Sequence, residues 1–301
     1  MTYVQMNIMH LNNLASKKSD IKNWKLGISS GGINHLTLEK YINMKTASID
    51  AVELSYNFEK DEGFDIFKQK EYADNADILL WSFHLPWHHQ QCNIAHLDSN
   101  MRKIAVDIDK EMIKKCSAVG IKYGVIHPSG EPIDKKDRPQ AMINAQQSLY
   151  ELSKTAEKEN FVIAVENLPR TCLGNCSSDI NELLTVSESL KVCFDVNHLL
   201  TESHSDFIKR AGKKIATLHI SDYDFINERH WMPGEGKINW TELINLLEGI
   251  GYEGAFIYEL NLKPEKTIKR RDLTYSDFKD NFNELSRKMK PAALGVPDIP
   301  V

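Results

Sequence analysis

The sequence predicts an α/β protein of one domain, folded as a closed (β/α)8 barrel. From Lys25 onward, short apolar runs alternate with helical patterns in eight rounds, which favours right-handed βαβ units and a parallel sheet. The length of 301 residues suits a barrel of this kind. No Ser/Gly-rich linker, low-complexity tract or long-period repeat divides the chain, so a single domain is expected.

The strands are expected at the short apolar runs. These runs are Lys25–Ser29, Ala51–Ser55, Ile78–Leu85, Tyr123–His127, Phe161–Glu166, Val192–Asp195, Ile215–His219 and Ala255–Glu259. Between them, apolar residues recur at helical spacing. The expected helices are Leu36–Lys45, Gly63–Ala76, Asp98–Val119, Arg138–Glu159, Ser178–Ser187, Ser205–Ala211, Trp240–Ile250 and Tyr275–Met289. Glycines at 120 and 251 fall where a helix ends before the next strand.

The two ends of the chain differ from the repeating part. Residues 1–23 are expected to be an N-terminal extension, residues 24–290 the barrel, and residues 291–301, with three prolines, an extended peripheral tail. The first twenty residues hold no apolar core of signal-peptide length, and no apolar run is long enough to span a bilayer. We therefore expect a cytoplasmic protein with no membrane partner.

Composition narrows the class of function. A net charge of -5 gives no sign of a general nucleic-acid-binding surface, so a nucleic-acid partner is not expected. Five cysteines, an odd number with irregular spacing, favour free thiols over a disulfide framework. The loop after His84, which carries Trp87 and the pair His88-His89, is a candidate contact between subunits of a homo-oligomer; the two histidines are otherwise read as surface or lid residues.

The segment from Lys213 to Trp240 is the most informative stretch. It begins as the apolar strand that ends at His219, and it continues as a loop crowded with groups that bind metals or sugars: Ser221, Asp222, Asp224, Glu228, Arg229 and His230. The loop closes on Pro233-Gly-Glu-Gly236, whose glycines permit positive φ angles and a close approach of backbone to a ligand. A histidine at the end of a buried strand, followed by a long polar loop, is typical of the mouth of a barrel.

Polar residues end five further strands. They are His84, His127, Glu166, Asp195 and Glu259. The carboxyl ends of parallel barrel strands lie on one face, so these side chains should converge with His219. Buried charges must be paired or bound to a cation. Glu166, Asp195, His219 and Glu259, from four successive strands, therefore predict a site for Mn, Mg, Co or Zn.

These motifs resemble the xylose isomerase-like TIM-barrel superfamily. The resemblance is carried by Glu166-Asn167, Asp195-x-x-His198, His219-Ile-Ser-Asp222, the Pro-Gly-Glu-Gly turn and Tyr258-Glu259, and it covers about residues 25–290. The superfamily includes sugar isomerases and epimerases, inosose dehydratases and apurinic endonucleases of the endonuclease IV type.

The resemblance implies a sugar isomerase or epimerase with one divalent metal. In the ketose 3-epimerases, residues matching Glu166, Asp195, His219 and Glu259 hold the metal, and the two glutamates move the proton through an enediolate. The residue matching His198 contacts substrate oxygens. His84, His127 and His230 are further candidates to bind sugar hydroxyls. Arg229 is adjacent to the position of an epimerase arginine, where this chain has His230.

Two alternative functions remain open. A keto-inositol dehydratase would use the same metal and a glutamate base. An endonuclease IV-like phosphodiesterase acting on abasic DNA is favoured by nine residues that parallel that family's three-zinc ligand set. Beyond the four residues above, these are the candidate additional ligands His84, His127, His198, Glu228 and His230. Glu in place of Asp at 228, a shorter loop after His219 and the absence of a basic excess count against the nuclease.

Overall fold

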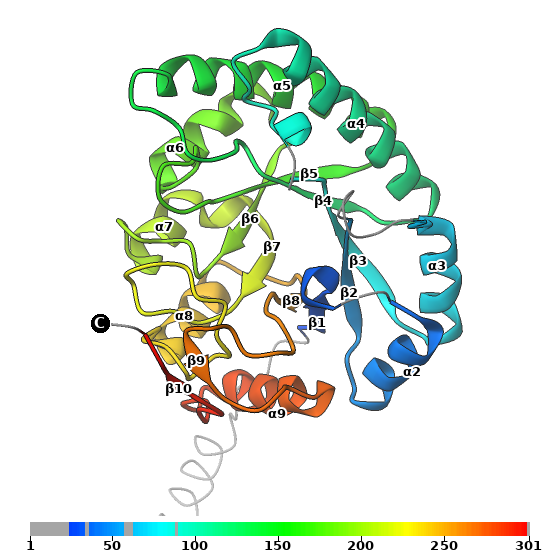
Figure 1. Ribbon diagram of the computed structural model, residues 1–301, viewed down its shortest axis with the longest axis vertical. Helices are drawn as coiled ribbons and strands as arrows, with labels where there is room; N and C mark the ends of the chain where they lie inside the picture. Colours follow the sequence, from blue (N-terminus) through cyan, green and yellow to red (C-terminus); the bar gives the residue numbers. More distant parts are fainter. Residues whose placement is uncertain (1–23, 34–35, 57–62, 88–89, 300–301) are drawn as a thin grey trace, which may run out of the picture.

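The protein is a closed barrel of eight parallel strands surrounded by helices, as predicted (Figure 1). The structure is a computed structural model that describes residues 24–33, 36–56, 63–87 and 90–299, so the expected N-terminal extension and His88-His89 lie outside the described residues. The strands follow one another in chain order, and β1 closes the barrel by pairing with β8. They are β1 Leu26–Ser29, β2 Ala51–Ser55, β3 Leu79–His84, β4 Tyr123–Ile126, β5 Val162–Glu166, β6 Lys191–Asp195, β7 Ile215–Ile220 and β8 Phe256–Tyr258.

A helix follows each strand and covers the outside of the barrel (Figure 1). These helices are α2 Leu38–Thr46, α3 Ile66–Asn75, α4 Ser99–Ala118, α5 Arg138–Lys158, α6 Ser177–Leu183, α7 His204–Ala211, α8 Trp240–Gly249 and α9 Tyr275–Ser286. Each begins close to its predicted start, and side-chain caps fix several of these starts; Asp98, for example, accepts hydrogen bonds from the backbone of Asn100 and Met101. Among the described residues, no helix is both long enough and apolar enough to cross a membrane.

A two-stranded sheet was not expected from the sequence. β9 (Ile268–Lys269) follows β8 and pairs antiparallel with β10 (Val296–Pro297), so part of the C-terminal tail is held against the segment after β8. The backbone N–H of Asp298 extends this contact by donating to the carbonyl of Thr267 at 2.8 Å. Strands of two residues are too short to show any apolar alternation, which explains why the sequence pattern did not reveal them.

The interior of the barrel is filled by layers of small and apolar side chains. Val125, Ala164 and Cys193 form one fully buried cluster. Ala51, Ala255 and Ile257 form another, against which Trp81 packs. Side chains along a strand alternate between inside and outside. The next inward positions, toward the carboxyl ends of the strands, are therefore the ones at which the polar residues converge.

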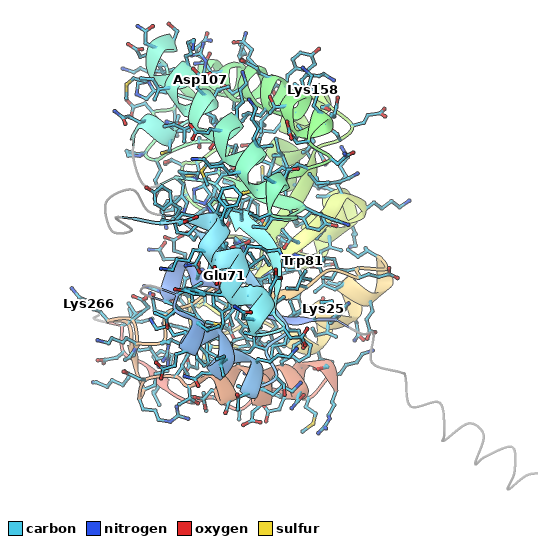
Figure 2. The ribbon with its side chains drawn as sticks, turned by 90° about the vertical axis from the view of Figure 1, so that its right-hand side faces the viewer. Lys25, Glu71, Trp81, Asp107, Lys158 and Lys266 are labelled. Carbon is cyan, nitrogen blue, oxygen red and sulfur yellow. The ribbon has the colours of Figure 1, made fainter. Side chains whose placement is uncertain are left out.

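The two ends of the barrel lie on opposite sides of the molecule. Lys25, just before β1, marks the amino end, and Lys266, in the segment after β8, marks the carboxyl end (Figure 2). Enzymes with this fold place their active sites at the carboxyl end, where the loops that follow the strands gather.

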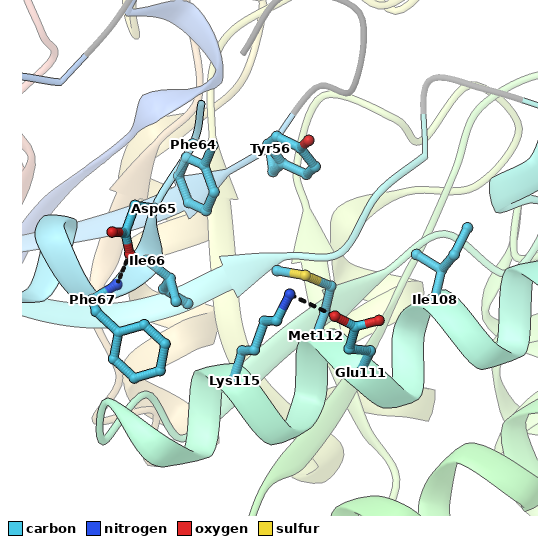
Figure 3. A pocket seen from close by; sticks show the side chains of 9 residues that line it. All are labelled: Tyr56, Phe64, Asp65, Ile66, Phe67, Ile108, Glu111, Met112 and Lys115. Carbon is cyan, nitrogen blue, oxygen red and sulfur yellow. Dashed lines mark hydrogen bonds and ion pairs between the residues drawn. The ribbon is translucent and has the colours of Figure 1, made fainter. Parts of the chain in front are cut away.

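A cavity outside the barrel lies between the start of α3 and helix α4 (Figure 3). It has a volume of about 280 Å³ and is mainly apolar, with Tyr56 and Phe64 on one side and Met112 on the other. Its charged side chains have partners: Lys115 pairs with Glu111 at 2.6 Å. Its described lining contains no histidine or cysteine, so it offers little for metal chemistry.

Candidate active site

A larger cavity opens at the carboxyl end of the barrel. Its volume is about 560 Å³, and its wall includes His127, Glu166, His198, Glu228, His230 and Glu259. The side chains come from the ends of β4, β5 and β8 and from the loops after β6 and β7. The cavity therefore lies where the sequence predicted the polar strand ends to meet.

The predicted set Glu166, Asp195, His219 and Glu259 forms one group at the floor of this cavity, where Glu166 and Glu259 belong to the cavity lining. One ligand-type atom from each lies within 4.8 Å of the others. Nδ1 of His219 is 3.1 Å from Glu166 Oε1, 3.1 Å from Glu259 Oε2 and 3.9 Å from Asp195 Oδ2. Glu166, Asp195 and His219 are buried, while the side chain of Glu259 is 21% exposed. We call these four residues the inner group.

Two further groups adjoin the inner group. His84 and His127 place Nε2 3.3 Å and 3.1 Å from Glu166 Oε2. On the other side, Nε2 of His198 is 3.3 Å from Glu228 Oε2 and 3.4 Å from Asp195 Oδ2. His230 completes this second set, since its ligand atom and those of His198 and Glu228 also lie within 4.8 Å of one another. The structure thus brings nine of the ten predicted site residues into one continuous cluster.

Burial and close charges shift the pKa values in this cluster. Burial alone would lower the pKa of His198, but the neighbouring carboxylates, Asp195 first, outweigh it and raise that pKa to about 10. Burial raises the pKa of Asp195 to about 7, against the opposing effect of His198. Burial would also raise the pKa of Glu259, yet His219 beside it holds that pKa far below its usual range. In the metal-free protein, protonated imidazole rings therefore offset the negative charge of the carboxylates.

The inner group has the donors that a divalent cation requires. Three carboxylates and one imidazole suit Mn, Mg, Co or Zn. Oδ2 of Asp195 is buried and accepts no hydrogen bond from the described residues, although Nε2 of His198 forms an ion pair with it at 3.4 Å. A buried carboxylate oxygen without a donor is costly unless a cation or an ordered water satisfies it. The residues thus fit a metal ion, which would displace the imidazole proton between them.

The loop after β7 is organised by Asp222. Its carboxylate accepts hydrogen bonds from the backbone N–H groups of Gly234 at 2.9 Å and Ile238 at 3.1 Å, and from the Trp240 indole at 2.8 Å. A Cβ at Gly236 would lie 2.2 Å from Asp222 Oδ1. The glycines of the Pro-Gly-Glu-Gly turn therefore allow the backbone to approach Asp222, and Asp222 itself serves as an anchor of the loop.

Arg229 is the predicted site residue that the structure does not bring to the cavity. Its side chain pairs with Asp224 at 2.8 Å and lies over the ring of Trp231. Trp231 is buried and donates to Thr267 at 3.0 Å, so it packs in the core. Trp87, the other loop tryptophan, lines the cavity next to His127, with ring centroids 4.9 Å apart.

Comparison with known proteins identifies the family. Residues 43–277 match the family described as xylose isomerase-like TIM barrel. The chain belongs to this family. The resemblance inferred from the motifs is thus confirmed.

Named relatives of this xylose isomerase-like barrel are isomerases or epimerases. The D-psicose 3-epimerase of Enterocloster bolteae is 26% identical over 240 residues, which cover 75% of this chain and 77% of the relative. The inosose isomerase of Halalkalibacterium halodurans is 28% identical over 170 residues, which cover 52% of this chain and 58% of the relative. These relatives place the chain among isomerase-class enzymes, as predicted. The crystal structure of a D-tagatose 3-epimerase-like protein shares the fold, with a TM-score of 0.73 and 23% identity over 87% of this chain and 96% of that chain.

The sequence analysis missed two residues of the site, one buried beneath the inner group and one at the rim of the cavity. Glu53, in β2, is fully buried beneath the inner group, and its Oε1 is 2.9 Å from His219 Nε2. A charged residue in the middle of the apolar run Ala51–Ser55 was the available signal. At the rim, Arg170 pairs with Glu131 and, at 3.0 Å, with Glu228, and thereby joins three loops. These loop residues have no distinctive spacing in the sequence.

Proposed function

We propose that this chain is a metal-dependent sugar epimerase or isomerase that moves a carbon-bound proton of a small keto-sugar. The observation that carries the proposal is the inner group, in which three carboxylates and one imidazole meet at the floor of an open cavity. Family membership and the named epimerase and isomerase relatives support the same class of reaction.

The inner group would hold one divalent ion through Glu166, Asp195, His219 and Glu259. When bound, such an ion supplies a Lewis acid that stabilises negative charge on substrate oxygens. We leave the ion as Mn, Co, Mg or Zn, because carboxylate and imidazole donors suit all four.

Glu166 and Glu259 are assigned as the groups that move the proton. Glu259 is the more accessible of the two, and its lowered pKa keeps it ionised near neutral pH, ready to accept a proton. Removal of a proton next to a carbonyl by one glutamate leaves an enediolate in the substrate. Delivery of a different proton by the second glutamate to the opposite face of the same carbon is epimerisation, and delivery of a proton to the neighbouring carbon is isomerisation.

The remaining wall of the cavity is assigned to substrate binding. His127, His198 and His230 line it and have ring nitrogens for hydroxyl groups, while His84 lies just behind them, with its ring centroid 4.9 Å from that of His127. Arg170 is the guanidinium in the cavity lining, and Glu131 and Glu228 already pair with it. Because its guanidinium is already paired with carboxylates, this wall offers no free positive charge of that kind for a phosphate group. We therefore favour an uncharged sugar over a phosphorylated one.

The proposal is tested by proton exchange. Protein loaded with Mn²⁺ is incubated with a panel of ketoses in D2O, and incorporation of deuterium at carbon is followed by NMR. The proposal predicts exchange and a new sugar for at least one ketose, and no exchange with the Glu259→Gln protein. Loaded protein that exchanges no ketose proton would contradict it.

A second candidate function is favoured by the two additional groups. His84 and His127 share Glu166 with the inner group, and His198, Glu228 and His230 form a third potential site. Two or three zinc ions in such an arrangement would suit hydrolysis of a phosphodiester in abasic DNA.

Metal stoichiometry and one variant separate the two functions. The sugar enzyme predicts one tightly bound ion per chain and a raised KM for the His230→Ala protein. The phosphodiesterase predicts two or three zinc ions and loss of one of them in His230→Ala. Cleavage of abasic-site DNA by zinc-loaded protein would decide in favour of the second function.

A further inference from the structure

Glu53 contacts the inner group from below, inside the barrel. It lies in the middle of β2 and is fully buried. Its two carboxylate oxygens have different partners: Oε2 accepts from the Ser82 hydroxyl at 2.7 Å, and Oε1 is 2.9 Å from Nε2 of His219. The carboxylate therefore links β3, on one side of the barrel, with β7, on the other.

The two nitrogens of the His219 ring face opposite surroundings. Nδ1 faces the carboxylates of Glu166 and Glu259 at 3.1 Å each, where a metal ion would bind. Nε2 lies within hydrogen-bonding distance of Oε1 of Glu53. A carboxylate can only accept, so Nε2 carries a proton and donates it to Glu53. The lone pair of Nδ1 is then directed toward the inner group once that nitrogen is free of its own proton.

Irregularities in the sheet place these partners. The register between β2 and β3 shifts at Val52/Glu53, which sets Glu53 opposite Ser82. The register between β6 and β7 shifts at Val192/Cys193, which sets His219 opposite Asp195. Trp81 lies at the first of these shifts and Thr217 at the second. The indole N–H of Trp81 donates to the hydroxyl of Thr217 at 3.1 Å. Such shifts re-aim side chains near active sites.

We propose that Glu53 is a positioning residue that fixes the protonated nitrogen and the ring orientation of His219, and so strengthens metal binding by the inner group. This inference rests on the metal site of the proposed function, but not on the identity of the sugar. Groups that orient a histidine ligand in this way are commonly worth about 10- to 100-fold in metal affinity.

The test measures the Kd of Mn²⁺ in the full-length protein, by the EPR signal of free Mn²⁺, and does not depend on turnover. Glu53→Leu removes the acceptor, and its Kd should rise about 10- to 100-fold. Glu53→Gln retains a carbonyl oxygen that can accept from Nε2, so it should bind more tightly than Glu53→Leu. Ser82→Ala, which removes only the support of Glu53, should weaken binding less than Glu53→Leu does. Glu235→Gln is the matched control, because Glu235 is equally buried but neighbours Arg270, and its Kd should equal that of the wild type.

A second measurement reports the ring directly. In zinc-loaded protein with ¹⁵N-labelled histidine, His219 should show a proton on Nε2 and a metal-shifted Nδ1, and Glu53→Leu should lose this pattern. The inference is overturned if Glu53→Leu binds Mn²⁺ as tightly as the wild type, or if Glu53→Gln is as weak as Glu53→Leu, which would assign the effect to charge. If Glu53→Leu does not fold, the comparison of Glu53→Gln and Ser82→Ala with the wild type decides: unchanged Kd values in both overturn the inference. Failure of the wild type itself to bind metal would overturn the metal site along with it.

Discussion

The floor and the rim of the site are built from different parts of the fold. The floor consists of Glu53 and the inner group, which lie within strands or directly at their ends; all of these residues except Glu259 are buried. The rim consists of Glu131, Arg170, Glu228 and His230, which belong to loops and are partly exposed. Arg170 and His230 also have positive φ angles of 51° and 50°, which residues other than glycine rarely adopt.

This difference separates two roles. Positions at the floor follow from the closure and register of the barrel, so their geometry is rigid and suits chemistry. Positions at the rim depend on salt bridges between loops, which are worth little individually and can rearrange around a substrate. We therefore expect changes at the floor to act on turnover and metal binding, and changes at the rim to act on KM.

The largest effect is expected from Glu259→Gln. This change keeps the size of the side chain but removes the base, so kcat should fall about 10²- to 10⁴-fold. Steady-state kinetics on the ketose found by proton exchange measures it, with metal content determined in parallel. Glu111→Gln, on the outer surface of α4, is the control and should leave kcat unchanged. Full activity in Glu259→Gln would remove Glu259 from the mechanism.

Asp195→Asn should act chiefly on the metal. The amide is a poorer ligand and has no charge, so the Kd for Mn²⁺ should rise by more than about 100-fold, beyond the effect expected for a residue that only orients a ligand. Metal titration of chelator-treated protein measures this. An unchanged Kd would show that Asp195 is not a ligand.

Metal affinity should fall as the pH decreases. Burial raises the pKa of Asp195 to about 7, so below that pH its carboxyl group is increasingly protonated in the metal-free protein. The pKa of His219 is also raised, since Cys193 and then the surrounding carboxylates outweigh the lowering effect of its burial, and its proton must leave for Nδ1 to bind a metal. Each displaced proton weakens binding about tenfold per pH unit. Competition with a fluorescent chelator between pH 6 and 8 measures this, and a flat profile would contradict the assignment of these ligands.

The smallest effect is expected at the rim. Arg170→Ala breaks the links to Glu131 and Glu228, so KM should rise a few-fold while kcat stays within about twofold. Arg271→Ala is the matched control, because Arg271 forms its salt bridge with Asp277 on the surface, at 2.7 Å. A large loss of kcat in Arg170→Ala, with KM unchanged, would show that the rim takes part in the chemical step. The division of roles between rim and floor would then be wrong.

The sequence located every residue of the floor except Glu53, whereas at the rim it located Glu228 and His230 but not Glu131 and Arg170. Glu166 and Asp195 could be located because each ends an apolar strand, and parallel strands in a barrel end on one face. Glu53 was missed because its role depends on which inward layer it occupies and on the register shift at Val52/Glu53, neither of which leaves a pattern in one sequence.

Contacts between loops account for the other differences. Arg229 was taken as a substrate residue from its place beside His230, but its side chain pairs with Asp224 and is not part of the cavity lining. The Pro-Gly-Glu-Gly turn was read as a place where backbone approaches a ligand; in the structure its backbone approaches Asp222, a contact that the sequence pattern did not predict. In both cases a short-range hydrogen bond, invisible to spacing, decides where the group points.

The most direct test of this account is the metal content of the protein, purified without chelator, loaded with Mn²⁺ or Zn²⁺ and dialysed before elemental analysis. The inner group predicts one tightly held ion per chain, which Asp195→Asn loses. A protein that retains no ion after loading would contradict the account of the floor, and retention of two or three zinc ions would contradict its assignment to sugar chemistry.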